Sequence, residues 1–159
     1  MSFNLIIISF LSGGAESHID LIKKIQLTQK SSQKTVQKLS KELATKVAEE
    51  LNANPNPGDF YSLHRNDGVD VDFASTFLRT VKVTKVIFFF ITIADAIDSK
   101  SGSLIIQGSS DDIAAIADEI CGLLGGKGNG KNNRYQAKVT QLNKIKDCEV
   151  LMKKHFENK

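Results

Sequence analysis

The sequence predicts an α+β protein in which a long N-terminal helical arm precedes a small mixed sheet with helices packed on it. Residues 18–51 hold no proline or glycine, and their apolar side chains recur at alternating spacings of three and four residues, as in a long helix. Residues 86–91 read VIFFFI, a continuous apolar run typical of a central strand buried on both faces. Short strand and helix patterns then alternate, which indicates helices packed on a small sheet.

The predicted arm covers residues 1–52 and ends at the break NANPNPGD, because proline, asparagine and glycine interrupt regular structure. Two polar residues lie in its apolar seam, so we expect a helix that docks intermittently or bends near residues 28–33. Residues 1–11 are apolar, lack a basic leader and are too short to cross a membrane, which favours a buried strand or helix start over a signal peptide. The seam consists of Ile22, Ile25, Gln29, Ser32, Val36, Leu39 and Leu43.

Residues 59–159 form the predicted globular domain, with strands at 60–63, 83–94 and 103–107 and helices at 71–81, 109–124 and 142–156. Ser109 or Ser110 is placed to cap the second helix, and Asp111 and Asp112 in its first turn suit the helix dipole. The apolar residues expected to face the core from the three helices are Val71, Ala74, Phe77, Leu78 and Val81, then Ile113, Ile116, Ala117, Ile120 and Leu124, then Ile145, Cys148, Met152 and Phe156.

The net charge of +3 conceals two basic segments around an acidic one. Residues 23–46 hold seven lysines against one glutamate, residues 125–159 hold nine basic against three acidic residues, and residues 47–124 hold twelve acidic against five basic residues. Basic segments at both ends suggest a surface for a polyanion, although lysines also solvate ordinary helix faces. Two distant cysteines outside any CxxC motif are typical of reduced thiols in a cytoplasmic protein.

Residues 122–138 contain five glycines, four basic residues and no acidic residue. The sequence predicts a flexible, cationic loop whose backbone amides cradle phosphate groups, with an exposed, solvated linker as the alternative. A side chain at Gly128 or Gly130 is expected to hold the backbone away from a phosphate. The predicted nucleic-acid-binding residues are Gly125, Gly126, Lys127, Gly128, Gly130, Lys131, Arg134, Tyr135, Gln136 and Lys138.

Several motifs for nucleotide binding, metal binding and hydrolysis are incomplete or absent in this sequence. Residues 125–132 fall one residue short of a Walker A motif, because Asn132 has no hydroxyl for magnesium and the segment follows a helix pattern rather than a strand. The three histidines are too scattered for a zinc motif, no G-x-S-x-G elbow occurs, and the aspartates at 67, 70 and 72 lack the glycine and glutamate of a calcium loop. We therefore predict no catalytic and no metal-ligating residue in this chain.

Three motifs occur in order along the chain: GAESH at residues 14–18, LHRNDG at 63–68 and GKGNGKNNRYQ at 126–136. Together they resemble the C-terminal, DHH-associated domain of the alanyl-tRNA synthetases and alanyl-tRNA editing proteins. The likeness is greatest to the stand-alone, AlaX-type editing proteins of eukaryotes. It covers about residues 13–159, and its last motif is the most specific one.

The resemblance implies a role in the hydrolysis of mischarged seryl-tRNA(Ala). In this family the editing site is a zinc site built from an HxxxH and a CxxxH pair in an N-terminal domain, and neither motif occurs in this sequence. What carries over is association with tRNA, expected to be tRNA(Ala), and not catalysis or zinc binding. The chain is expected to be a fragment, a split gene product or a truncated paralogue that works beside a separate editing domain.

Two functions from different classes remain open. In the first, the chain is an accessory domain that grips tRNA phosphates through the glycine-rich segment and the lysines of the arm, and Tyr135 stacks on a base or ribose. In the second, the arm seam at residues 36–47 pairs with another copy of the chain, and the basic loop is incidental. Neither function involves a membrane. The arm lysines invoked by the first function are Lys30, Lys34, Lys38 and Lys41.

We expect the purified chain not to deacylate seryl-tRNA(Ala), with or without added zinc. The physical reason is that a hydrolytic zinc needs about three protein ligands and one open position. A deacylation assay with zinc, and again with a chelator, measures this. Zinc-dependent turnover that disappears on chelation would show that the sequence holds a ligand set without a recognised motif.

Overall fold

A computed structural model describes residues 15–67, 69, 71–82 and 86–158. The apolar segment at residues 1–11, and residues 83–85 of the expected central strand, lie outside the described residues. The first helix among the described residues, α2 (Ala15–Ala53), has 39 residues and continues through residues 28–33, where the sequence allowed a bend. None of the described helices is both long and apolar enough to span a bilayer.

The chain divides into two compact units, residues 1–39 and residues 40–159. The division falls within α2, upstream of the break at residues 52–59 where the sequence placed it. The cause is burial: Ala44, Ala48 and Leu51 on the last turns of α2 are at most 4% exposed and belong to the core of the second unit. In the first unit, five seam and flanking residues are 41–57% exposed: Ile19, Ile22, Ile25, Val36 and Leu39.

The second unit is built on a five-stranded mixed sheet with the strand order β1-β2-β3-β5-β4. The first two strands pair in parallel, and the other neighbours are antiparallel. β2 is buried along its whole length, as the apolar run predicts, although it begins at Phe88. The strands are β1 (Phe60–Arg65), β2 (Phe88–Ala94), β3 (Gly102–Gln107), β4 (Lys127–Lys131) and β5 (Arg134–Val139).

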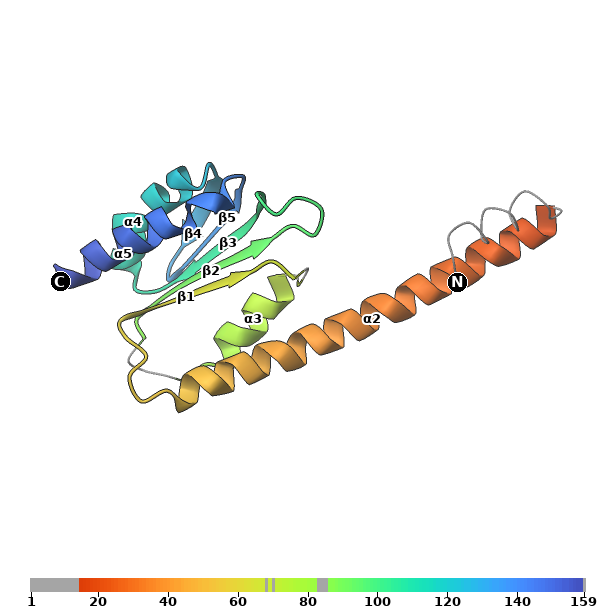
Figure 1. Cartoon of the computed structure of the whole chain (residues 1–159), viewed down its shortest axis with the longest axis horizontal. Helices are drawn as coiled ribbons and strands as arrows, with labels where there is room; N and C mark the ends of the chain where they lie inside the picture. The colour runs from red at the N-terminus through yellow and green to blue at the C-terminus, as the bar shows by residue number, and fades with distance from the viewer. Residues whose placement is uncertain (1–14, 68, 70, 83–85, 159) are drawn as a thin grey trace. The chain divides into compact units, whose positions relative to one another are not determined.

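Helices cover both faces of the sheet (Figure 1). On one face lie α4 (Ser110–Leu123) and α5 (Ile145–Glu157), the latter entered through a short 3-10 helix, η1 (Leu142–Lys144). On the other face lie α3 (Val71–Thr80) and the last turns of α2. The predicted α+β fold with a long N-terminal helix is therefore confirmed.

The alternation of side chains along the strands divides the core into two clusters. Phe88 and Phe90 pack with α4 and α5, whereas Phe89 and Ile91 pack with α3 and α2. The predicted core stripe of α4 is confirmed, because all of its members are at most 7% exposed: Ile113, Ile116, Ala117, Ile120 and Leu124.

The beginning of α4 also follows the prediction. Ser109 is the N-cap, with φ of −66° and ψ of 153°, and its Oγ accepts a hydrogen bond from the backbone N–H of Asp112 at 3.1 Å.

On α3 one residue differs from the prediction, because Val71 is 46% exposed while Phe73 is fully buried beneath the guanidinium of Arg65. The face of α3 is set by the strand and helix that cover it, which the local pattern does not contain.

The glycine-rich segment at residues 122–138 is not the flexible loop that the sequence predicts. It holds the end of α4 and most of a β-hairpin in which Asn132 and Asn133 join β4 to β5. Asn132 has φ of 57°, a left-handed conformation that asparagine tolerates better than most residues. The turn is fastened to the sheet where the backbone N–H of Gly108 donates to the carbonyl of Asn133 at 3.1 Å. The prediction fails because glycine and asparagine are rare in strands.

We expect Ile116→Ala to lower the free energy of unfolding by about 2–5 kcal/mol, because it removes a buried side chain and leaves a cavity under α4. Ile116 is 5% exposed. Val150→Ala on α5 is the matched control, since Val150 is 66% exposed and its truncation should shift stability by only about 0.5 kcal/mol. Equal unfolding midpoints in denaturant for the two variants would contradict the packing of α4.

Candidate nucleic-acid interface

Glycine alternates with lysine or asparagine along β4, which reads K-G-N-G-K. Because successive side chains of a strand point to opposite faces, Gly128 and Gly130 share one face, and Lys127, Asn129 and Lys131 share the other. The glycines face α4 and β5: a Cβ at Gly128 would lie 2.5 Å from the carbonyl oxygen of Gln136, and one at Gly130 would lie 2.9 Å from the ring of Tyr135. Side chains are therefore excluded from one face of β4 and all directed to the other.

The pairing of β4 with β5 extends this polar face. Lys127 lies opposite Lys138, Asn129 opposite Gln136, and Lys131 opposite Arg134. Directly opposed residues of an antiparallel pair project to the same side of the sheet. The six side chains form a lattice on one side of the sheet, with a cation pair at each end and an amide pair in the middle. We call this surface the basic sheet face: Lys127, Asn129, Lys131, Arg134, Gln136 and Lys138.

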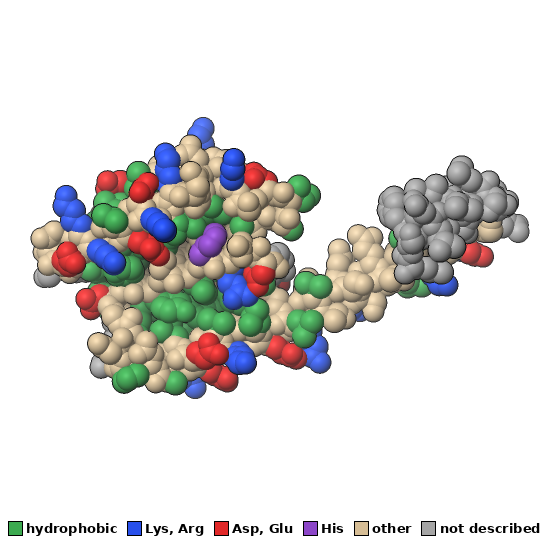
Figure 2. All heavy atoms as spheres, in the orientation of Figure 1, with side chains coloured by type: hydrophobic (Ala, Val, Ile, Leu, Met, Phe, Trp, Pro, Cys, Tyr) green, Lys and Arg blue, Asp and Glu red, His purple; other side chains and the backbone are tan. Residues whose placement is uncertain are grey.

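The basic sheet face is the uncovered part of the sheet surface whose other part lies under α3 and α2. Those helices pack on side chains of β1, β2 and β3, including Ile105, which is the register partner of Gln136. The border is marked by Arg134, whose Nη2 lies 3.4 Å from the Oγ of Ser75 on α3. Lys127, Lys131 and Lys138 are exposed beyond it. By contrast, the face in Figure 2 mixes acidic and basic side chains around an apolar patch.

Like charges stand directly opposite each other at both ends of the basic sheet face. Such pairs destabilise a hairpin, because their repulsion is not offset across the strands. Few contacts relieve it. Lys138 Nζ lies 3.9 Å from Asp95 in an exposed pair, and Arg134 donates to the amide oxygen of Gln136 from Nε at 3.0 Å and Nη2 at 2.7 Å when that amide is oriented to accept. The face can thus neutralise an external polyanion.

Tyr135 does not belong to this face, which corrects the expectation that it stacks on a base. Its side chain points toward α4, is 5% exposed, and donates a hydrogen bond from Oη to Oδ1 of Asp118 at 2.8 Å. Burial, followed by the neighbouring Cys121 and Asp118, raises the pKa of the phenol well above its usual range. The phenol therefore stays protonated and serves as a packing residue and hydrogen-bond donor.

The predicted cradle of glycine amides is corrected at its first two positions, Gly125 and Gly126. The N–H of Gly125 donates to the carbonyl of Gly122 at 3.0 Å, and that of Gly126 donates to the carbonyl of Cys121 at 2.9 Å. Gly125 has φ of 62°, which allows α4 to end in a tight turn. These two amides close the helix and are therefore not available to a phosphate. Asn129 was missed from the sequence, although the K-G-N-G-K alternation contained the signal for it.

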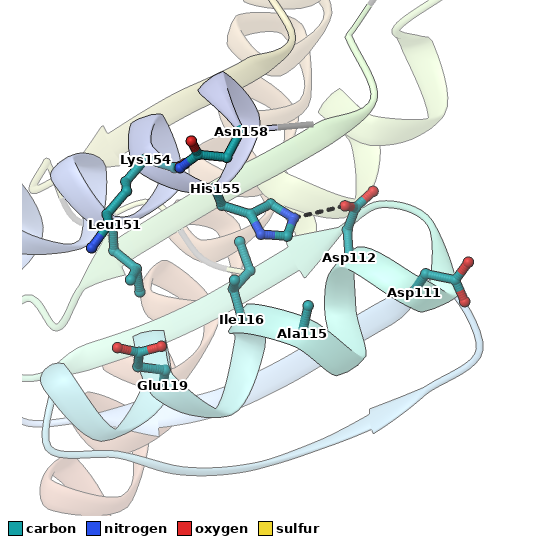
Figure 3. A pocket seen from close by; sticks show the side chains of 9 residues that line it. All are labelled: Asp111, Asp112, Ala115, Ile116, Glu119, Leu151, Lys154, His155 and Asn158. Atoms are coloured by element: carbon teal, nitrogen blue, oxygen red, sulfur yellow. Dashed lines mark hydrogen bonds and ion pairs between the residues drawn. The ribbon is translucent and has the colours of Figure 1, made fainter.

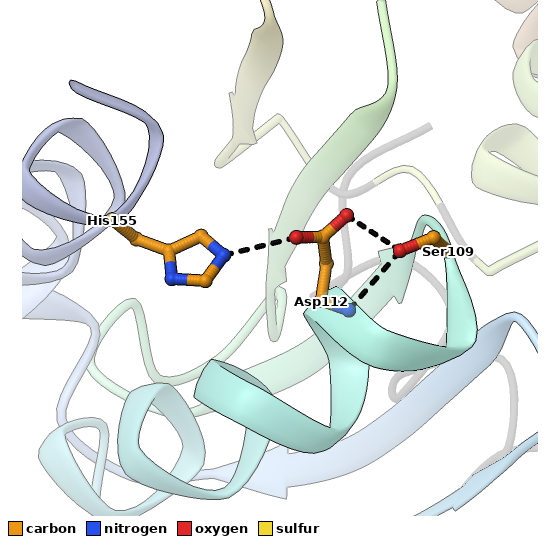
Figure 4. Close-up of polar contacts among 3 residues, drawn as sticks. All are labelled: Ser109, Asp112 and His155. Carbon is orange, nitrogen blue, oxygen red and sulfur yellow. Dashed lines mark hydrogen bonds and ion pairs between the residues drawn. The ribbon is translucent and has the colours of Figure 1, made fainter. Parts of the chain in front are cut away.

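A second polar cluster joins α4 to α5 at the groove drawn in Figure 3. His155 Nε2 lies 2.9 Å from Oδ1 of Asp112, whose other oxygen accepts from the hydroxyl of Ser109 (Figure 4). The order of contacts is serine, aspartate, histidine. A hydrolytic triad needs the histidine beside the serine hydroxyl to take its proton. This cluster therefore joins the two helices and does not activate a nucleophile.

Within the described ranges, no group of three histidine, cysteine or acidic side chains is placed to hold a metal ion. Cys121 and Cys148 are buried free thiols. Burial raises the pKa of Cys148 to about 11, so this thiol is neutral and unreactive at physiological pH. Of the three aspartates at 67, 70 and 72, the second lies outside the described residues.

Comparison with curated proteins finds alanyl-tRNA editing proteins. Aarsd1-A of Xenopus laevis is 32% identical over 146 residues, which are 92% of this chain and 34% of that protein. Aarsd1 of Danio rerio is 32% identical over 143 residues, and Aarsd1 of Rattus norvegicus is 28% identical over 144 residues. The chain spans 34% of the length of each of these relatives. No protein-family model matches it.

Among solved structures, the C-Ala domain of alanyl-tRNA synthetase from Aquifex aeolicus aligns with 62% of this chain and 93% of that domain. The TM-score is 0.44 and the sequence identity is 20%.

Proposed function

The chain is homologous to the alanyl-tRNA editing proteins over about a third of their length, and on this premise we propose that it is a tRNA-binding accessory part of alanyl-tRNA editing. Its partner in this proposal is tRNA(Ala), and the edited species is mischarged seryl-tRNA(Ala). Hydrolysis and zinc binding belong to a separate editing domain, and this chain holds the tRNA.

The observation that carries the proposal is the basic sheet face. Four cations lie on one side of the hairpin, and the six side chains of this face include no carboxylate. Their cross-strand repulsion costs stability, so an arrangement that keeps them together is explained best by a polyanionic ligand. Lysine and arginine supply charge-assisted hydrogen bonds to phosphate oxygens, and the two amides between them supply further donors.

The opposite side of β4 disfavours the same ligand. There α4 presents Asp118, an exposed residue that lines the same hollow as Gly128 and Gly130. A phosphate backbone is repelled by this carboxylate and attracted by the basic sheet face, so the tRNA is directed to one side of the hairpin. The exposed lysines of α2 offer a further basic surface, at Lys30, Lys34 and Lys38 in the first unit and at Lys41 in the second.

Dimerisation through α2 is the second candidate function, and it is favoured by Val36 and Leu39, which are 56% and 57% exposed. The seam available to a second copy is shorter than the sequence predicts. Leu43 and Val47 pack against the core of the second unit and are no longer free to pair with another helix. A mass that rises with concentration in sedimentation equilibrium would favour this function, if tRNA affinity also stayed the same when residues of the basic sheet face are replaced.

We expect simultaneous replacement of Lys127, Lys131 and Lys138 by alanine to weaken tRNA binding and to flatten its salt dependence. Each phosphate contact contributes roughly 0.7–0.9 to the slope of log affinity against log salt, so the slope should fall by about two to three units. The melting temperature should stay equal or rise, because the variant removes two like-charge contacts. Fluorescence titration of tRNA at several salt concentrations gives both quantities.

The matched control replaces Lys146, Lys153 and Lys154 on α5 by alanine. These lysines are exposed, their loss changes the net charge by the same amount, and α5 lies on the other face of the sheet. We expect a much smaller change of slope for the control. Equal slopes for the two variants would assign binding to net charge alone and would contradict a specific role of the basic sheet face.

A further inference from the structure

We propose, as an extension that rests on the function above, that the basic sheet face binds the phosphate backbone of base-paired RNA and does not read unpaired bases. The surface recognises the regular shape of an RNA helix. It follows that this part of the protein docks on a helical region of its RNA and leaves the single-stranded acceptor end to another part of the editing machinery.

The first support is the position of the aromatic side chains. Proteins that bind single-stranded RNA stack bases on exposed aromatic rings, and sequence-specific ones add contacts to base edges. The aromatic residue of the hairpin, Tyr135, is directed to the other side of the sheet and engaged by Asp118. Across the part of the chain that the structure describes, no phenylalanine or tyrosine is in the exposed class. The face therefore lacks an aromatic stacking platform.

The second support is the rigidity of the cation lattice. Lys127 and Lys131 stand four residues apart on β4, about 13 Å, and their partners Lys138 and Arg134 lie about 5 Å away on β5. Both strands are held in a sheet, so the Cα positions from which these four side chains project are fixed. An RNA helix presents phosphates that are already ordered, whereas a flexible single strand must lose conformational freedom to match the lattice.

The third support is the chemistry at the centre of the lattice. Asn129 and Gln136 lie opposite each other between the two cation pairs. Their amides donate to phosphate oxygens and exchange hydrogen bonds with 2′-hydroxyl groups, which line the wide minor groove of an RNA helix. These contacts do not depend on the identity of the bases. The face has the groups for backbone and sugar recognition along one strip.

The test compares three probes: a blunt RNA hairpin, a second hairpin of unrelated sequence, and an oligouridylate with the same number of phosphates. Binding of the full chain is measured by fluorescence anisotropy at matched salt. We expect the two hairpins to bind with equal affinity and about tenfold more tightly than the oligouridylate, because the flexible strand must be ordered on binding and gains no aromatic stacking. The variant without Lys127, Lys131 and Lys138 should lose this preference.

The outcomes separate this inference from the proposed function. Oligouridylate binding as tightly as the hairpins, or unequal affinities for the two hairpins, overturns the inference. If tRNA still binds through the three lysines in that case, the proposed function stands. Failure of tRNA and of all three probes to bind overturns both.

Discussion

The ring of Tyr135 packs against the backbone of β4 at the two positions where that strand has no side chains. A Cβ at Gly128 would lie 2.7 Å from the ring, and one at Gly130 would lie 2.9 Å from it. The phenol is held in this place by its hydrogen bond to Asp118 on α4. Side chains on this side of β4 would meet the ring of Tyr135 and the backbone of β5, and glycine stands there instead, so every side chain of that strand is displayed on the other side. The basic sheet face depends on this contact.

The same contact explains how a strand of poor intrinsic propensity persists at the edge of a sheet. Glycine weakens strands, and like-charge pairs weaken hairpins. The energetic cost of these features is offset by the burial of three hairpin residues against α4 and α5: Tyr135, Ala137 and Val139. Lysines on an edge strand also discourage another chain from adding to the sheet. Stability is thus supplied by one face of the hairpin while the other face is left to binding.

Much of the fold is predictable from local sequence. The stripe of α4 from Ile113 to Leu124, the Ser109 cap and the buried strand beginning at Phe88 all follow from periodicity or side-chain chemistry within a few residues. The hairpin was not predicted, because its glycines favour strand structure only when a partner ring covers them. The burial of Tyr135 depends on Asp118, seventeen residues earlier in the chain, and a local pattern holds no record of such a partner.

The basic residues of the candidate site were therefore predicted as a group, whereas the loop expected around them is a β-hairpin in the structure. The basic residues were identified, but their glycine neighbours were assigned to phosphate and Tyr135 to a base. Glycine alternates with lysine or asparagine along β4, so adjacent residues of this strand point to opposite sides of the sheet. The glycines lie on the packing side, and the polar residues lie on the side proposed to bind. Gly128 lies on the packing side and its neighbour Asn129 lies on the binding side.

The most direct test compares the thermal unfolding of Gly128→Ala and Asn129→Ala. A Cβ at Gly128 would lie 2.5 Å from a backbone oxygen and 2.6 Å from Ala137, so we expect this variant to lose about 1–3 kcal/mol of stability through overpacking. Asn129 faces the open side, and its truncation should change stability by only about 0.5 kcal/mol. Equal melting temperatures for the two variants would contradict the assignment of β4 to one packing side and one binding side.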